Sequence, residues 1–233
     1  MASSLVAGHV QPQREKEHEI MTMPMNLVLV CRGQSADDEE NGPSPESRLS
    51  GLGCEQAEAA GKWIKGGLRG MVFDRYYVPP YARAGETAVL LDLPTAKWSM
   101  EPALCSTTDS PNLYERVHGR VFDSLHRDKD MNVLVVCDAE VIVAIRVLLE
   151  NFFPGKQGAH KYPVHNGNIV HYTRRDPIGN TPVNGRISWV RSICPTDESR
   201  PNDSTVWGKV YRRSFGNDEL HRELQAMYPE QYK

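Results

Sequence analysis

The sequence has no excess of basic residues and no long hydrophobic run, and each absence removes a class of function. Its 27 lysines and arginines are outnumbered by 30 aspartates and glutamates, which gives a formal net charge of −3. Nucleic acids and anionic membrane surfaces favour a basic partner, so we expect this chain to bind neither. None of its apolar runs approaches the length of about 20 residues that crosses a membrane.

Paired cysteine motifs and metal-binding histidine pairs are missing as well. The five cysteines are an odd number without a CxxC spacing, which favours buried thiols in a reducing compartment over a disulfide framework. No two histidines show a ligand spacing such as HxxxH. The first residues also lack the basic stretch of a signal peptide. We therefore expect a cytoplasmic protein with no metal and no other cofactor.

What is present suits one globular domain with a sizeable core. The chain has 233 residues, of which 39% are hydrophobic and 24% charged, and these values are typical of a soluble domain of this length. We expect residues 1–25 to form a flexible N-terminal arm. The domain is then predicted over 26–233, with a C-terminal extension from about residue 195.

Apolar runs and helical periodicity alternate along the chain. Apolar runs predict strands at 27–30, 73–78 and 132–137. The spacing of apolar residues predicts helices at 49–68, 82–93, 113–127, 140–153 and 217–227. Residues 94–112 are predicted to be irregular, and 164–175 and 185–193 to form more exposed, partly antiparallel strands, with a turn at Asn166-Gly167. This order predicts a three-layer α/β domain whose sheet is mostly parallel and flanked by helices.

Three junctions between a strand and the following helix carry the candidate site. They are Cys31-Arg32-Gly33, the segment from Pro79 to Arg83, and Cys137-Asp138-Ala139. Ligands of open α/β sheets bind beyond the C-terminal ends of the strands. We therefore expect these three junctions to converge there.

Five ordered segments resemble the histidine phosphatase (phosphoglycerate mutase-like) superfamily. LVCRGQS, from Leu29, is similar to the family run LVRHGQS/T, and LSGLGCEQA, from Leu49, to LTPLGREQA. FDRYYVPPYARAGETA and VLVVCDAEVI, from Phe73 and Val133, are similar to two later family segments, and VHNGNIV, from Val164, to a third. The resemblance covers roughly residues 26–175 and implies a phosphoglycerate mutase-like fold.

The family's chemistry, as the resemblance implies it, needs residues that this sequence has replaced. A histidine at the end of the first strand attacks a phosphoryl group, a second histidine and two arginines hold the charge, and an acid protonates the leaving oxygen. Here Arg32 stands at the nucleophile position and Asp138 at that of the second histidine. Ser106 falls where the acid is expected. Among the core phosphate-binding residues, the resemblance implies that Arg83 is retained.

The replacements predict a neutralised site. A guanidinium stays protonated and cannot act as a nucleophile, and an aspartate about 4 Å from a bound phosphate would repel it by roughly 1–4 kcal/mol. Arg32 and Asp138 are instead expected to form an ion pair that closes the pocket. The alternative for Arg32 is bidentate anion binding.

Other residues keep an anion-binding role open. Gln34 and Ser35 match the family, and Arg83 begins a helix, where free N–H groups favour anions. The alternative for Arg83 is a solvated side chain or a local pair with Glu86. His165 is a further candidate for the pocket rim.

Cys31 and Cys137 end strands that are neighbours in this fold. We expect buried, unreactive thiols there. The alternative is a redox pair, or a metal site that also uses Asp138.

Three functions remain open at this point. The first is a catalytically inactive protein that acts as a binding, structural or regulatory subunit, with a protein partner or a second copy of itself. The second is an active phosphomonoesterase or mutase with a rearranged site. The third is a sensor that binds a phosphate-type anion, such as a phosphorylated metabolite, without turnover.

Overall fold

The computed structural model describes most of the predicted domain. The described residues are 22–37, 44–68, 70–106, 113–150, 163–183, 185–197, 199–200, 204–210, 212 and 216–227. The predicted arm and the end of the helix predicted at 140–153 therefore lie largely outside them. The last arm residues that are described pack against the domain: Met23 is buried, and its N–H donates to the carbonyl of Gly185 at 3.1 Å.

A seven-stranded sheet forms the middle layer, in the order β3-β2-β4-β1-β5-β6-β7. The strands are β1 (Asn26–Cys31), β2 (Arg75–Val78), β3 (Trp98–Met100), β4 (Asn132–Cys137), β5 (Ile169–Thr173), β6 (Trp189–Ile193) and β7 (Ser204–Lys209). The pairs from β3 to β1 are parallel, and those from β1 to β7 are antiparallel. The sheet is thus mixed, with the parallel half on the side of the candidate site.

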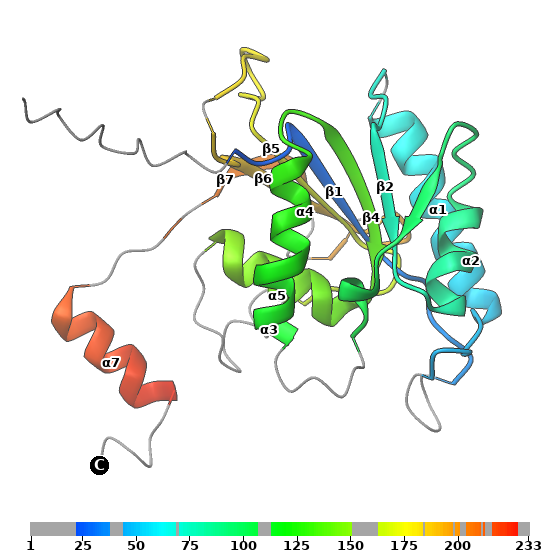
Figure 1. Ribbon diagram of the computed structural model, residues 1–233, viewed down its shortest axis with the longest axis horizontal. Coiled ribbons are helices and arrows are strands. Elements are labelled where there is room, and N and C mark those ends of the chain that lie inside the picture. Colours follow the sequence, from blue (N-terminus) through cyan, green and yellow to red (C-terminus); the bar gives the residue numbers. More distant parts are fainter. Residues whose placement is uncertain are drawn as a thin grey trace, which may run out of the picture.

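Helices cover both faces of the sheet, as Figure 1 shows. One face packs against α1 (Gly51–Gly67) and α2 (Ala82–Leu90). The other packs against α3 (Leu113–Arg116), the π-helical turn η2 (Val117–Val121), α4 (Phe122–Arg127) and α5 (Ala139–Glu150). The predicted three-layer α/β fold is confirmed, and α7 (Asn217–Met227) is present where the sequence predicts it.

Several local predictions were wrong. The stretch 94–112, predicted to be irregular, contains β3 and the short 3₁₀ helix η1 (Pro102–Leu104). Strand β7 was not predicted at all. Strand β5 was predicted to be more exposed, yet all five of its residues are buried. It is flanked by β1 and β6, and three of its side chains belong to the hydrophobic core: Ile169, Val170 and Tyr172. Within the described part of the chain, no helix is both long and apolar enough to cross a membrane.

Candidate functional site

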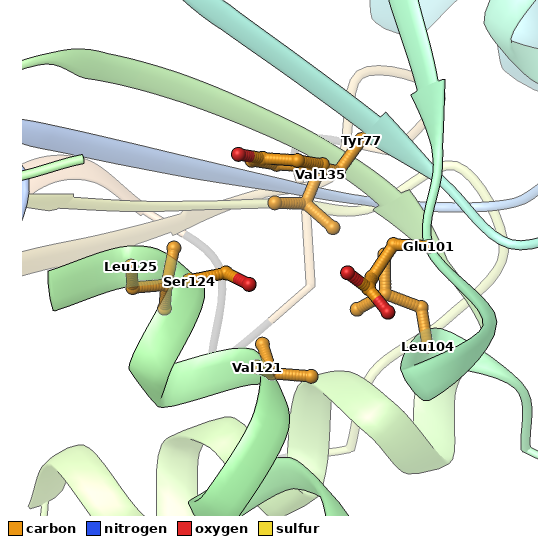
Figure 2. A pocket seen from close by; sticks show the side chains of 7 residues that line it. All are labelled: Tyr77, Glu101, Leu104, Val121, Ser124, Leu125 and Val135. Carbon is orange, nitrogen blue, oxygen red and sulfur yellow. The ribbon is translucent and has the colours of Figure 1, made fainter. Parts of the chain in front are cut away.

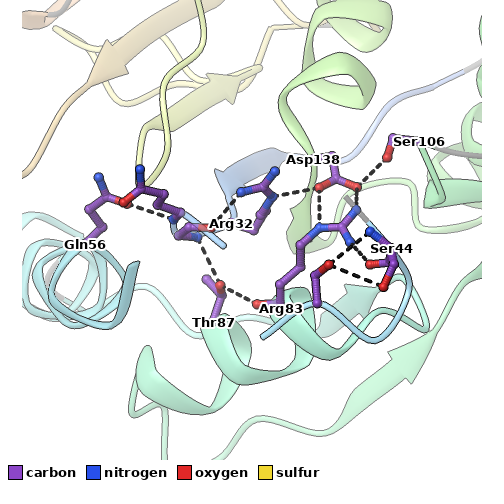
Figure 3. Close-up of polar contacts among 10 residues, drawn as sticks. Arg32, Ser44, Gln56, Arg83, Thr87, Ser106 and Asp138 are labelled. Carbon is purple, nitrogen blue, oxygen red and sulfur yellow. Dashed lines mark hydrogen bonds and ion pairs between the residues drawn. The ribbon is translucent and has the colours of Figure 1, made fainter. Parts of the chain in front are cut away.

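The predicted junctions meet at the C-terminal ends of β1 and β4. Cys31 and Cys137 are register partners in this parallel pair, and the N–H of Arg32 donates to the carbonyl of Cys137 at 3.0 Å. Asp138 follows immediately, at the start of α5, and Arg83 lies in the first turn of α2. The expected convergence is therefore confirmed, and Figure 3 shows the side chains that meet there.

The Asp138 carboxylate is the centre of this cluster. Its Oδ1 accepts from Nε of Arg32 at 2.9 Å and from Nε of Arg83 at 3.1 Å. Its Oδ2 accepts from an Nη of Arg83 at 3.0 Å and from Oγ of Ser106 at 2.6 Å. A carboxylate has about four lone-pair positions. These four donors therefore fill the hydrogen-bonding capacity of Asp138.

Arg32 forms the ion pair that the sequence predicts. Its side chain is 11% exposed, and besides Asp138 it donates to the carbonyl of Gly33 at 3.0 Å. The Arg32 side chain is thus a bound cation that faces the neighbouring strand end.

Arg83 is completely buried, and the predicted solvated or Glu86-paired alternative is wrong. It pairs with Asp138, donates to the carbonyl of Ser44 at 2.6 Å, and lies 4.4 Å above the ring centre of Tyr81. Glu86 instead accepts from Arg48 and from the N–H of Leu49. The tertiary partner satisfies a buried charge, which a solvent-exposed local pair cannot do.

The cluster keeps Asp138 ionised. Burial of the carboxyl would raise its pKa, but the hydrogen bonds from Arg83, Ser106 and Arg32, with the charge of Arg83, lower the pKa of Asp138 below its usual value. A carboxylate with a depressed pKa and filled lone pairs is a weak base. It is therefore a poor base for activation of the Ser106 hydroxyl as a nucleophile.

Backbone contacts fix the loop that carries Arg32. The N–H of Gly33 donates to Oγ of Thr87 at 3.1 Å, and that hydroxyl donates to the carbonyl of Arg83 at 2.8 Å. A side chain at Gly33 would come within 2.2 Å of the carbonyl oxygen of Gly53 in α1. Only glycine permits this approach between the loop and the helix.

Gln34 and Ser35 lie beside α1. The side-chain oxygen of Gln34 accepts from the hydroxyl of Ser50 at 3.1 Å. The backbone N–H of Gln34 donates to the side-chain oxygen of Gln56 at 2.9 Å. Ser35 is buried and forms a β-bridge with Leu49. The contacts of Gln34 thus fix the N-terminal end of α1. An anion-binding role for Gln34 and Ser35 stays a prediction.

The predicted Asn166-Gly167 turn is present and packs against the same loop. Gly167 has a positive φ of 76°, and its N–H is shared between the carbonyls of Cys31 and Arg32, each at 3.2 Å. His165 precedes this turn and is half-buried. The structure therefore brings its backbone near the site, while its predicted place at the rim stays a prediction.

Burial disfavours reaction at the two neighbouring thiols. Cys31 and Cys137 are both buried and both unoxidised. Burial, followed by the neighbouring Cys31 and Asp138, raises the pKa of the Cys137 thiol well above its usual value. Because the thiolate is the nucleophile and the metal ligand, this thiol is unreactive. The residues that the structure describes contain no group of three or more metal-ligating side chains.

A separate hollow lies on the face of the parallel half of the sheet that packs against η2 and α4. It is lined by Tyr77, Glu101, Leu104, Val121, Ser124, Leu125 and Val135 (Figure 2). Its empty volume of about 230 Å³ includes the open solvent, so its enclosed space is well below the range of roughly 300–1,000 Å³ typical of ligand pockets. The cluster around Asp138 is therefore the stronger candidate site.

Sequence reasoning missed two members of that cluster. Ser44 contributes only its backbone carbonyl, for which its side chain gives no signal. Thr87 lies four residues after Arg83, one helical turn on, and this spacing inside the resembling segment was the available signal.

Solved structures share this fold. The sequence matches no family model, and it matches no curated protein. A phosphoserine phosphatase from Entamoeba histolytica shares 16% identity and a TM-score of 0.52, over 71% of this chain and 96% of that one. A phosphoglycerate mutase from Bacillus anthracis shares 15% identity and a TM-score of 0.51, over 65% of this chain and 89% of that one.

The likeness defines the fold class. The chain has the α/β fold of phosphoglycerate mutases and related phosphatases, as the sequence predicts. At such low identity the likeness carries the fold alone.

Proposed function

We propose that this chain is a catalytically inactive relative of the histidine phosphatases that acts as a binding, structural or regulatory subunit. The observation that supports the proposal is the ion pair between Arg32 and Asp138, 2.9 Å between Nε and Oδ1. The family resemblance assigns the nucleophile and the second histidine to these two positions. Here they hold each other instead.

The chemistry of the cluster supports the same conclusion. Phosphoryl transfer through the enzyme needs a group that can give an electron pair to phosphorus. Arg32 has none to give, and Asp138 already accepts four hydrogen bonds. The Ser106 hydroxyl donates a hydrogen bond to Asp138. Because this aspartate is a weak base, the hydroxyl stays a poor nucleophile.

The experiment is a phosphatase assay with a matched control. Hydrolysis of p-nitrophenyl phosphate by the wild-type chain should equal that by Arg83→Ala and by Arg48→Ala, an exposed arginine outside the cluster. No acid-labile phosphoenzyme should form with a labelled phosphoryl donor. Wild-type turnover that a folded Arg83→Ala, checked by circular dichroism, loses and Arg48→Ala keeps would restore the second candidate, a phosphomonoesterase or mutase with a rearranged site.

The binding role calls for a partner, which we propose to be another protein or a second copy of this chain. Light scattering after size-exclusion chromatography, over a hundredfold range of protein concentration, tests the second copy. A mass that stays at one chain throughout contradicts self-association and leaves a different protein as the partner.

A further inference from the structure

We propose that the Asp138 carboxylate is a built-in replacement for a bound oxyanion, so that this chain's own side chain keeps the site closed to phosphate. This inference rests on the proposed function and concerns the same site. It predicts that the wild-type protein does not bind phosphate, and that removal of the carboxylate uncovers a phosphate site.

The donors around Asp138 are arranged as they would be around an anion. Two guanidinium groups and one hydroxyl converge on two oxygen atoms, with all four contacts between 2.6 and 3.1 Å (Figure 3). Such charge-assisted contacts are typical of carboxylate and phosphate recognition by arginine. The anion that they hold here comes from the protein itself.

The principal donor is held by contacts that do not involve Asp138. Arg83 also donates to the carbonyl of Ser44, stacks on the ring of Tyr81, and is anchored through its own carbonyl to Thr87. Likewise, Arg32 donates to the carbonyl of Gly33. Removal of the carboxylate should therefore leave these guanidinium groups close to their present positions.

Charge decides which anion occupies the site. Asp138 is 1% exposed and keeps its negative charge because its pKa is depressed. A phosphate that entered the wild-type site would have to take donors from a carboxylate that is tethered beside them. It would also meet that charge at short range in a poorly solvated environment, where repulsion is strong.

Calorimetric titration of inorganic phosphate into the wild type and Asp138→Ala tests the inference, with sodium chloride holding the ionic strength constant. The wild type should show no saturable binding. Asp138→Ala should show saturable binding, with an affinity at least tenfold above the detection limit set by the wild type, and phosphate should raise the melting temperature of this variant. In Asp138→Ala combined with Arg83→Ala, this binding should disappear, whereas Asp138→Ala combined with Arg48→Ala should keep it.

Two results would overturn the inference. One is saturable phosphate binding by the wild type that Arg83→Ala abolishes, which would instead support a sensor of phosphorylated ligands. The other is a folded Asp138→Ala that binds no phosphate. If Asp138→Ala folds only when phosphate is present, the inference is supported. If it folds under neither condition, Asp138→Ser, which is shorter and keeps a polar group, takes its place in the same titration.

The phosphatase assay separates this inference from the proposed function. Wild-type turnover of p-nitrophenyl phosphate would refute the inactive role, whatever the titration gives. An inactive wild type that binds phosphate would refute only the built-in anion.

Discussion

Arg83 and Asp138 form a side-on ion pair in the interior, with Nε 3.1 Å from Oδ1 and an Nη 3.0 Å from Oδ2. The pair joins the first turn of α2 to the start of α5. The two residues lie 55 positions apart in the sequence, so their contact ties distant segments together.

Replacement of Arg83 should therefore destabilise the fold strongly. Arg83→Ala removes two of the four hydrogen bonds that Asp138 accepts and leaves Arg32 as its cationic partner, and the loss of one partner of a buried pair typically costs about 3–5 kcal/mol. Arg48→Ala is the matched control, because Arg48 pairs with Glu86 while its side chain is 77% exposed, and such pairs contribute less than about 1 kcal/mol. Urea unfolding measures both changes in free energy, and equal losses would contradict the buried role of Arg83.

The hydroxyl of Ser106 should contribute to the same cluster. Ser106→Ala removes a 2.6 Å hydrogen bond to the charged Asp138, and bonds to charged groups contribute about 1.5–3 kcal/mol. Because that bond also lowers the pKa of Asp138, the pKa of this carboxyl should rise in the variant. Carboxyl titration followed by NMR, together with urea unfolding, checks both effects. An unchanged Asp138 pKa would show that the arginines alone keep the carboxylate ionised.

The close approach of the Arg32 loop to α1 can be tested with glycine substitutions. Gly33→Ala should destabilise the protein severely, since its Cβ would lie 2.2 Å from the carbonyl oxygen of Gly53. Gly66 lies in α1, the helix that contains Gly53, and a Cβ at this position would meet open space. Gly66→Ala should therefore stabilise the protein by roughly 0.5–1 kcal/mol. Thermal unfolding of the two variants should shift in opposite directions, and a tolerated Gly33→Ala would contradict the described approach.

Stability should fall with acid because of His171. This residue is buried, accepts from Arg191 at Nδ1 and contacts Asn26 through Nε2. Burial, with the charge of Arg191, lowers its pKa from 6.5 to about 3. Between these values the unfolded chain takes up a proton that the folded chain refuses, so stability should drop by up to about 1.4 kcal/mol per pH unit below 6.5.

Urea unfolding at a series of pH values measures this loss. His171→Gln has no titrating ring and should show a shallower slope between pH 6.5 and 3. Equal slopes in the wild type and His171→Gln would mean that His171 is not kept neutral in the folded state.

The sequence allowed the prediction of those parts of the site that follow from local pattern. The apolar runs before Cys31 and Cys137 placed both strand ends, and the opposite charges of Arg32 and Asp138 predicted their pair. The partner of Arg83 could not be predicted in this way. Glu86 was the local choice, and only the folded sheet brings Asp138 against a fully buried guanidinium.

The missed strands have a similar explanation. Strand β3 has only three residues, which is too short for an alternating pattern to be recognised. Strand β7 is mostly exposed on both faces, so it lacks the apolar alternation that identifies a half-buried strand. Its pairing with β6 comes from tertiary context.

The four donors that fill the Asp138 carboxylate have a consequence for evolution. Arg32, Arg83 and Ser106 share one negative charge, so a substitution at Asp138 alone would leave two buried cations without their counterion. Sequence drift at this position is therefore constrained by the others. Among descendants of this chain, we expect residues 32, 83, 106 and 138 to be inherited or exchanged as a set.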